Sequence, residues 1–331
     1  MTLALRCGWL LALAWLGAAP RCNAAPHSAA ARNDTRGSVR LQDWARAGGL
    51  DMRWLKSEQT VQLSANGVKL LLTVDSRQAE LNGVQVWLCF PVTARNGGVY
   101  VARLDVEQTL APLLMPSRDE SGAKIKTVCL DPGHGCKDPG YCVGPNQEKK
   151  YALLLAEEVR DQLKRAGFKV LMTRSRDTFR ELADRPGLAN RRRADLFVSL
   201  HFNAVETSSQ TVQGAQVFCL TPPGAASTNA GGDKGAAGSY PGNRTNSRNL
   251  LLAFQVQKAL THELGVEDRG VRRARFVVLC DASMPAILVE AGFMSHPIEG
   301  RKIFTALYRQ QMAKSIVDGI EAYKRVVGGA G

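Results

Sequence analysis

The chain has 331 residues, of which 45% are hydrophobic and 22% are charged. This composition excludes a chain that is disordered overall, and the length suits about two domains with a sizeable core. The formal net charge of +13 favours an anionic partner. Nucleic acid is not expected, because the sequence lacks the interleaved aromatic and basic strip that binds single strands.

The first 24 residues have the pattern of a secretory signal peptide. Arg6 precedes an apolar run from Trp9 to Leu16, and small residues then lead to a predicted cleavage site near Ala24. The run is too short to span a bilayer comfortably, and no later segment of the sequence is apolar and long enough to do so. We therefore expect export to a secreted or periplasmic location, with an uncleaved N-terminal anchor as the alternative.

Small and polar residues at 25–37 indicate a linker, and the pattern at 38–116 indicates a small, mostly β module. A short helix is expected at 41–50, and β-type runs follow it. Asn-Gly pairs, a strong hairpin signal, interrupt these runs at three places: 66–67, 82–83 and 96–97. The sequence therefore predicts a meander of hairpins in this module.

Parts of this module resemble the copper-amine-oxidase-type N-terminal modules found ahead of bacterial cell-wall enzymes. The resemblance lies in the turn at 79–83 and the strand at 99–101, and it covers residues 41–115. It implies no copper chemistry, because this region contains no histidine. We expect core packing for the three tryptophans of the predicted mature chain, with a sugar-stacking platform as the alternative: Trp44, Trp54 and Trp87.

A polar hinge is predicted at 117–123, and strand and helix patterns alternate beyond it, at 124–327. The predicted strands are 125–130, 168–173, 195–200, 213–220 and 286–290, and the predicted helices are 148–166, 181–193, 247–264 and 301–325. Alternation of this kind predicts an α/β fold with a mainly parallel sheet and helices on both faces. Residues 221–248, rich in Gly, Ala, Ser and Asn, are expected to form a mobile insert, either a lid or a segment without structure.

Three side chains suited to metal binding stand at the ends of separate predicted elements. His134 and His201 each follow a strand pattern, and Glu148 opens a helix pattern. Because the carboxyl ends of parallel strands meet at one edge of a sheet, these side chains can converge there. Two histidines and one carboxylate with an open fourth position are the ligands of a catalytic zinc hydrolase, so Zn²⁺ is the predicted cofactor.

Glu290 ends another apolar strand pattern, 286–290, at the same predicted edge. An isolated buried carboxylate is costly, so a partner is required. We predict that this partner is the reacting water and that Glu290 is the general base, with a structural salt bridge as the alternative. Three roles remain open for Asn203: it orients His201, it contacts the substrate, or it caps a turn.

Beyond these four residues, a set of motifs follows in a fixed order: Asp131-Pro132-Gly133-His134-Gly135 with Asp138-Pro139-Gly140, Glu148-Lys149, Thr173-Arg174 with Asp177, Leu182 and Arg185, the stretches 189–190 and 194–204, and 284–295. With these motifs, residues 124–323 resemble the zinc-dependent N-acetylmuramoyl-L-alanine amidases of bacterial cell walls. The resemblance implies a zinc held by His134, Glu148 and His201, with Glu290 catalytic. It also implies the substrate, the amide that joins the lactyl group of N-acetylmuramic acid to L-alanine in peptidoglycan.

The sequence departs from the family pattern in two places. Cys136 replaces the usual glycine after the His-Gly pair and Cys142 follows it, so we hypothesise a disulfide that stiffens this loop. The insert at 221–248 lacks apolar helical periodicity, so we predict that it contains no helix that blocks the active site, as some relatives carry. His262 and His296 lack metal-site partners and are expected at the surface.

The leading interpretation is an exported zinc amidase that acts on peptidoglycan in cell-wall remodelling, turnover or daughter-cell separation. We expect a monomer, and the need for a protein activator stays open. One alternative is a zinc peptidase or deacetylase acting on another amide. The other is an inactive wall-binding protein, which the joint presence of all three ligands and Glu290 disfavours.

Overall fold

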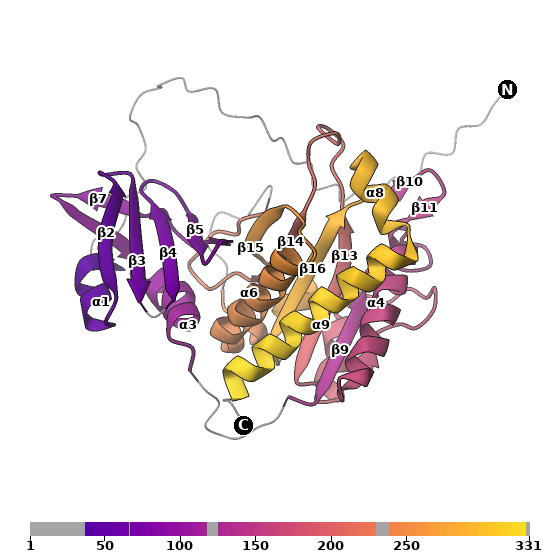
Figure 1. Ribbon diagram of the computed structural model, residues 1–331. Coiled ribbons are helices and arrows are strands. Elements are labelled where there is room, and N and C mark those ends of the chain that lie inside the picture. The colour runs from indigo at the N-terminus through magenta and orange to yellow at the C-terminus, as the bar shows by residue number, and fades with distance from the viewer. Residues whose placement is uncertain (1–36, 66, 118–124, 230–237, 329–331) are drawn as a thin grey trace.

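The computed structural model describes residues 37–65, 67–117, 125–229 and 238–328. Most of its strands form one eleven-stranded sheet, which runs through both halves of the chain in the order β12-β9-β13-β16-β14-β15-β6-β5-β4-β3-β2 (Figure 1). The C-terminal half contributes β12 (Lys169–Met172), β9 (Thr127–Pro132), β13 (Leu196–Asn203), β16 (Ala286–Phe293), β14 (Ala215–Leu220) and β15 (Asp268–Ala274). The N-terminal module contributes β6 (Val84–Trp87), β5 (Gln78–Leu81), β4 (Val68–Thr73), β3 (Thr60–Ala65) and β2 (Asp51–Lys56).

The C-terminal half confirms the predicted α/β fold. Strand β9 pairs in parallel with β12 and β13, β13 with β16, and β14 with β15, while β14 and β16 pair antiparallel. The central strands are buried on both faces, as their nearly continuous apolar sequences predict. The mainly parallel arrangement places the ends of β9, β13 and β16 at one edge of the sheet, where the candidate site lies.

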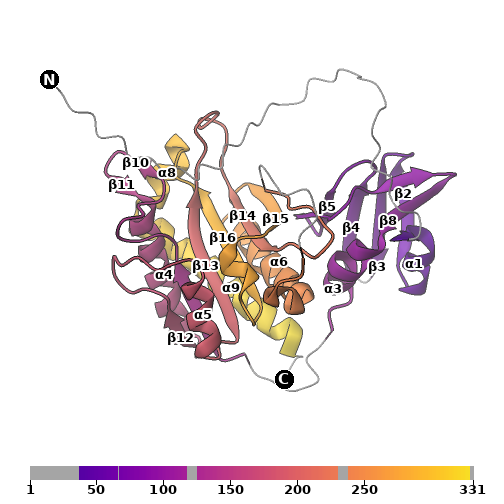
Figure 2. The same cartoon turned by 180° about the vertical axis from the view of Figure 1, so that it is seen from behind.

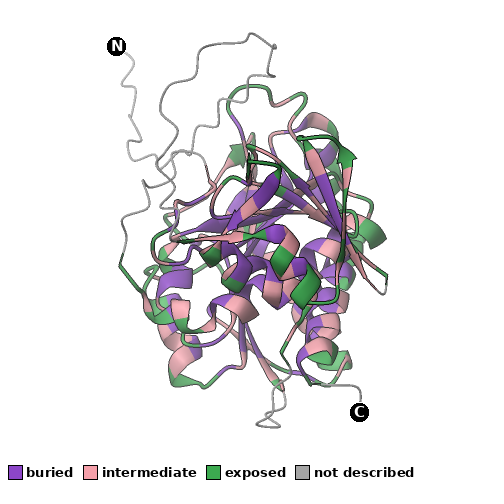
Figure 3. Cartoon of the chain, turned by 90° about the vertical axis from the view of Figure 1, so that its left-hand side faces the viewer, coloured by how far each residue is buried: buried purple, intermediate pink, exposed green. Residues whose placement is uncertain are grey.

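Helices cover both faces of this sheet. Helices α4 (Glu148–Arg165), α6 (Asn246–Glu263) and α9 (Ala306–Gly328) pack on one face, and α5 (Asp184–Arg191) and α7 (Val277–Cys280) on the other (Figures 1 and 2). Helix α4 turns Tyr151, Leu155, Val159 and Leu163 inward, because residues three or four apart share one face of a helix. Exposed residues gather on the outer faces of the helices, and the strands between them are buried (Figure 3).

The single helix predicted at 301–325 is two helices in the structure, α8 (Pro297–Ile303) and α9. His296, expected at the surface, is buried and caps α8, since its Nδ1 accepts a hydrogen bond from the Glu299 N–H at 3.1 Å. Histidine is an uncommon cap, so the sequence signal for this helix start was weak. His262 is exposed, as expected.

The N-terminal module is a meander of hairpins with helices around it. The turns at Asn82-Gly83 and Asn96-Gly97 have positive φ angles, as type I′ hairpins require, and join β5 to β6 and β7 (Thr93–Arg95) to β8 (Gly98–Ala102). Strand β1 (Ser38–Arg40) pairs with β8, and α1 (Leu41–Ala47) follows it. The described module ends in α2 (Arg103–Asp105), the π-helix η2 (Val106–Leu110) and α3 (Ala111–Leu114), which the sequence patterns did not predict. Trp44 and Trp54 pack against the core, as expected, whereas the Trp87 ring lies against the guanidinium group of Arg272.

The sheet passes from one half of the chain to the other through a strand that sequence reasoning missed. Strand β15 pairs with β14 on one side and with β6 of the module on the other, where Val271 is the partner of Val86. Apolar residues of both halves belong to one hydrophobic core. The module is therefore continuous with the C-terminal half in its sheet and in its core.

The predicted mobile insert at 221–248 is ordered in much of its described length. Thr221 and Ala225 are buried, and Thr228 exchanges two hydrogen bonds of 2.8 Å with the backbone of Arg273 on β15. Residues 241–245 form the 3₁₀-helix η3 (Pro241–Thr245), and α6 begins at Asn246. The absence of a blocking helix stays a prediction, because 230–237 lie outside the described residues.

Three further predictions fall on residues outside the description. These are the signal peptide at 1–24, nearly all of the linker at 25–37 and nearly all of the hinge at 117–123. Among the residues that are described, we find no helix with the length and apolarity needed to cross a membrane.

Candidate metal centre and active site

The loop after β9 presents His134 at the sheet edge. His134 has a left-handed backbone, with φ of 60°, and Gly135 follows at φ 136°. A Cβ at Gly135 would lie 2.2 Å from the Thr178 carbonyl oxygen, so only glycine fits there. Two buried arginines hold the loop carbonyls: Arg174 donates to Pro132 O and Gly133 O, and Arg185 donates to His134 O.

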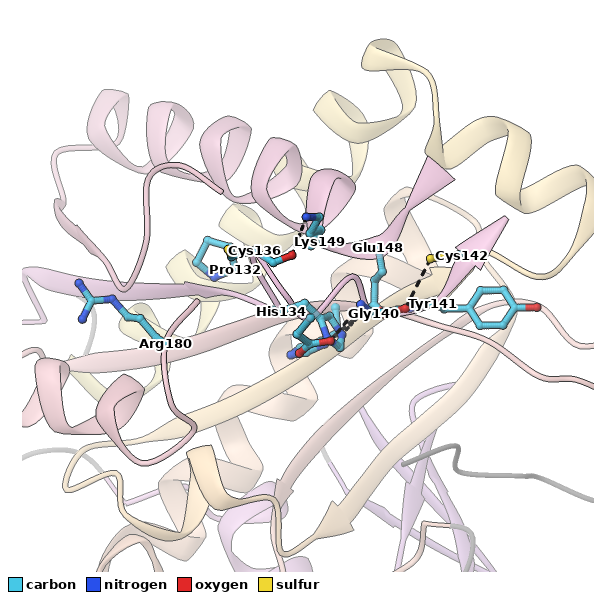
Figure 4. A network of polar contacts seen from close by, with 12 residues as sticks. Pro132, His134, Cys136, Gly140, Tyr141, Cys142, Glu148, Lys149 and Arg180 are labelled. Atoms are coloured by element: carbon cyan, nitrogen blue, oxygen red, sulfur yellow. Dashed lines mark hydrogen bonds and ion pairs between the residues drawn. The ribbon is translucent and has the colours of Figure 1, made fainter. Parts of the chain in front are cut away.

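The three predicted metal ligands meet at this edge, where Figure 4 shows His134 and Glu148. His134 comes from the loop after β9, Glu148 from the first residue of α4, and His201 from β13. Glu148 Oε1 lies 2.9 Å from His134 Nε2 and 3.0 Å from His201 Nδ1, and one ligand atom from each residue lies within 4.8 Å of the others. Two imidazole nitrogens and a carboxylate oxygen at this spacing suit a zinc ion with an open coordination position.

Two glycines make room for these ligands. A Cβ on Gly133 would lie 2.3 Å from His201 Cε1. A Cβ on Gly140 would lie 2.6 Å from Glu148 Oε2 and 2.7 Å from His134 Cδ2. Any larger residue at either position would push a ligand side chain aside, so the backbone is shaped to fit the ligand set.

In the ligand group, the charges of His134 and Glu148 each shift the pKa of the other residue. Burial disfavours the charged form of His134, but the charge of Glu148 and hydrogen bonds to Asp138 and Glu148 outweigh burial and raise the pKa of His134 to about 10. For Glu148, burial acts to raise the pKa, yet the two histidines lower it below its usual range. The metal-free site therefore holds a proton that a cation would displace.

Glu290 lies beside this group. It is the register partner of His201 on the neighbouring strand β16, and it lines a cleft that also contains Asn203 and Gln216. Its Oε2 is buried and has no hydrogen-bond partner within the part of the chain that is described. Burial, reinforced by the nearby charge of Glu148, raises the pKa of Glu290 to about 8. A partly buried carboxylate whose inner oxygen has no partner among the described residues, next to a candidate metal centre, is suited to proton transfer.

Comparison with known proteins agrees with this geometry. Residues 128–322 match the family model described as N-acetylmuramoyl-L-alanine amidase, and residues 24–111 match that of the copper amine oxidase N-terminal domain. The chain belongs to the N-acetylmuramoyl-L-alanine amidase family. Its N-terminal module is of the copper-amine-oxidase N-terminal type, as the sequence predicted.

Relatives of this amidase family are found among curated proteins and solved structures. The amidase AmiC of Neisseria meningitidis serogroup B is 35% identical to this chain. The aligned region covers 66% of this chain and 57% of AmiC. The amidase AmiA of Escherichia coli K12 is 33% identical over 63% of this chain and 79% of its own length. The crystal structure of an N-acetylmuramoyl-L-alanine amidase from Clostridium difficile 630 superposes with a TM-score of 0.50 and 32% sequence identity. The match covers 61% of this chain and 97% of the Clostridium difficile chain.

Asn203 has a local role in this member of the amidase family. Its Oδ1 accepts a hydrogen bond of 2.7 Å from the Ala204 N–H, so it stabilises a turn after a register shift in β13. It also lines the cleft with Glu290, which leaves substrate contact open.

The disulfide predicted between Cys136 and Cys142 is absent from the structure, where both are exposed free thiols. Cys136 lies in a left-handed turn that Asp177 anchors by accepting its backbone N–H, whereas Cys142 lies on the short strand β10 (Cys142–Val143), paired with β11 (Asn146–Gln147). In the view of Figure 4 the two side chains lie apart, to the left and to the right of Lys149 and Glu148. Sequence proximity did not bring the thiols together, because Cys136 is held in its turn and Cys142 in the β10–β11 pair.

Sequence reasoning assigned no role to two aspartates that support the site. Asp138 Oδ2 lies 2.8 Å from His134 Nδ1, and Asp131, fully buried, accepts hydrogen bonds from Arg185 and Thr173. Both aspartates lie in the sequence motifs around His134, and this nearness to His134 was the signal that could have identified them. What each one contacts depends on how the loop folds.

Proposed function

We propose that the protein is an exported, zinc-dependent N-acetylmuramoyl-L-alanine amidase that hydrolyses the amide between N-acetylmuramic acid and L-alanine in peptidoglycan. The observation that carries the proposal is the convergence of His134, Glu148 and His201 beside the unpartnered carboxylate oxygen of Glu290. Family membership supports the substrate, and the signal-like sequence of residues 1–24 supports export.

In this proposal His134, Glu148 and His201 hold the zinc. A zinc ion bound there would polarise the amide carbonyl and make water more acidic. The chain's own contribution is to orient the ligands: Asp138 fixes the His134 ring through Nδ1, which leaves Nε2 for the metal. Gly133 and Gly140 keep the space that these side chains need.

Glu290 is the proposed proton carrier. As a carboxylate it takes a proton from the attacking water, and it then returns that proton to the leaving nitrogen of L-alanine. Its place beside the ligand group, with Oε2 free of a hydrogen-bond partner among the described residues, suits both steps, because that oxygen can accept a proton and return it. The products would be the glycan strand with a free lactyl carboxylate and a stem peptide with a free amine.

The decisive experiment compares the mature protein with Glu290→Gln and His134→Ala. We expect the wild type to bind about one zinc per chain and to release stem peptides from purified peptidoglycan. Glu290→Gln should keep the zinc and lose at least about a hundredfold in rate, since proton transfer contributes that much. His134→Ala should lose both the zinc and the activity.

Other outcomes would redirect the assignment. Release of acetate, or cleavage within the peptide, would identify a deacetylase or a peptidase instead. Binding to peptidoglycan without release of stem peptides, with zinc bound, would indicate a wall-binding protein or an enzyme that needs an activator. Addition of envelope extract to that sample would then separate these two.

A further inference from the structure

The cleft beside Glu290 also contains two arginines. Arg269 and Arg272, both on β15, line the same cavity as Glu290, together with Asn229 of the insert. The charged residues of β15 hid this strand from sequence analysis, so neither arginine was assigned a role. A stem peptide ends in a carboxylate, and guanidinium groups bind carboxylates strongly and with defined geometry.

Arg272 is held in a fixed position in the cleft wall. Only 5% of the residue is exposed, its Nε donates to Arg269 O at 3.1 Å, and its Nη1 donates to Thr228 O at 3.1 Å. Burial, together with the neighbouring charge of Arg269, lowers the pKa of Arg272 to about 10. Both guanidinium groups are cations at neutral pH. Arg269 Nη1 lies 3.5 Å from Glu267 Oε1, so a substrate carboxylate would share Arg269 with this ion pair while it is attracted by both positive charges.

The N-terminal module supports this wall from the other side. The Arg272 guanidinium carbon lies 4.4 Å from the centre of the Trp87 ring, at the end of β6. Strands β15 and β6 approach closely at Gly270, where a Cβ would lie 3.2 Å from Trp87 Cδ1. The module also reaches the insert, because Arg77 Nη2 donates to Ala226 O at 2.9 Å. Trp87 is thus placed to fix the guanidinium plane by stacking.

We propose that Arg272 and Arg269 bind a carboxylate of the stem peptide, and that Trp87 of the N-terminal module is a positioning residue for Arg272. The inference rests on the proposed amidase function and adds a specificity-determining subsite to it. It also gives the module a role within the cleft, as part of the wall that selects the substrate.

The test uses two soluble glycan-peptide substrates that differ only in their stem carboxylates, free in one and amidated in the other. We expect the zinc-loaded wild type to prefer the free carboxylates by about 10- to 100-fold in kcat/KM, as a charged hydrogen-bonded contact implies. Arg272→Gln should lose most of this preference through a higher KM for the free-carboxylate substrate. Its kcat and zinc content should be nearly unchanged.

Two further variants and one control sharpen the result. Trp87→Leu should raise KM for the free-carboxylate substrate by a smaller factor than Arg272→Gln does. Trp87→Phe should return this KM toward the wild-type value, because phenylalanine again offers a ring face to Arg272. Arg95→Gln is the matched control, since Arg95 also stacks on a ring, that of Tyr100, but lies exposed and outside the cleft. If Arg272→Gln does not fold, Arg269→Gln, which is less buried, makes the same test.

Failure of the inference and failure of the proposed function give different results. If the wild type releases stem peptides from both substrates at equal rates, or if the arginine variants keep the wild-type preference, the carboxylate subsite is wrong while the amidase function stands. If zinc-loaded protein releases stem peptides from neither substrate, the proposed function fails, and the subsite fails with it.

Discussion

Asp138 Oδ2 lies 2.8 Å from His134 Nδ1, while the other nitrogen of the same ring, Nε2, lies 2.9 Å from Glu148 Oε1. One imidazole therefore connects the predicted metal site to a carboxylate behind it. A carboxylate in this position fixes the tautomer and orientation of a histidine ligand and makes it more basic.

We predict that Asp138→Ala weakens zinc binding by about 10- to 100-fold, because the His134 ring loses its orienting partner. Zinc affinity is measured by competition with a chelator. Asp161→Ala is the control, since Asp161 pairs with Arg160 on α4 with a side chain that is 48% exposed. Equal zinc affinities for Asp138→Ala and the wild type would show that the hydrogen bond does not support the metal.

Zinc binding should release about two protons at pH 7. In the metal-free site the pKa of His134 is raised to about 10 and that of Glu290 to about 8, so both groups hold a proton that a nearby cation repels. Zinc affinity should consequently rise with pH and level off above the pKa of His134. Calorimetry in buffers with different heats of ionisation counts the protons, and Glu290→Gln should release about one fewer.

Gly133→Ala should disrupt the ligand group without unfolding the chain. Its Cβ would lie 2.3 Å from His201 Cε1, so the imidazole must move away from Glu148. We expect zinc affinity to fall by at least about tenfold, the effect of misplacing a ligand. Gly238→Ala is the control, because a Cβ there would meet nothing within 4 Å. Unchanged zinc binding in Gly133→Ala would contradict the convergence of the ligands.

Alkylation of the native protein should label Cys136 and Cys142, both exposed and free, within minutes. Cys89, Cys129 and Cys219 are buried and should react only after unfolding. Burial raises the pKa of the Cys89 and Cys129 thiols to about 12, which keeps them protonated and unreactive. Peptide mass spectrometry identifies the labelled residues, and protection of Cys136 and Cys142 until a reductant is added would reveal the disulfide after all.

Arg273→Met should lower the free energy of unfolding by about 3–5 kcal/mol, the cost of removing one member of a buried charged cluster. Arg273 is fully buried and donates to Thr109 Oγ1, which in turn donates to Asp105 Oδ1. Burial already raises the pKa of Asp105, and loss of Arg273 would raise it further. The extra destabilisation should therefore grow as pH rises above the raised pKa of Asp105 in the folded wild type, where this carboxyl ionises in the wild type but stays protonated in the variant.

Denaturant unfolding at several pH values measures this loss, with Arg53→Met on the exposed side of β2 as the control. The wild type should unfold in a single transition, because one sheet and one core join the module to the C-terminal half. Two separate transitions, with Arg273→Met affecting neither, would show that the interface contributes little.

Local patterns were sufficient for much of this protein. Asn82-Gly83 favours a hairpin because both residues readily adopt the positive φ angles of its turn. The short apolar runs that form β9, β13 and β16 are typical of strands buried on both faces. His134 and Glu148 could be placed at one sheet edge because parallel strands end together. Their convergence followed from topology and needed no knowledge of packing.

Other features depend on contacts between distant parts of the chain. Strand β15 contains Asp268 and three arginines, so nothing in its sequence predicts a central strand. It becomes one because Trp87, Thr109 and carbonyl groups of the module and the insert contact the guanidinium groups of Arg272 and Arg273. A charged side chain can be buried only where partners meet it, and only the tertiary structure brings those partners together. The continuous sheet, the ordered part of the insert and the separation of Cys136 from Cys142 arise in the same way.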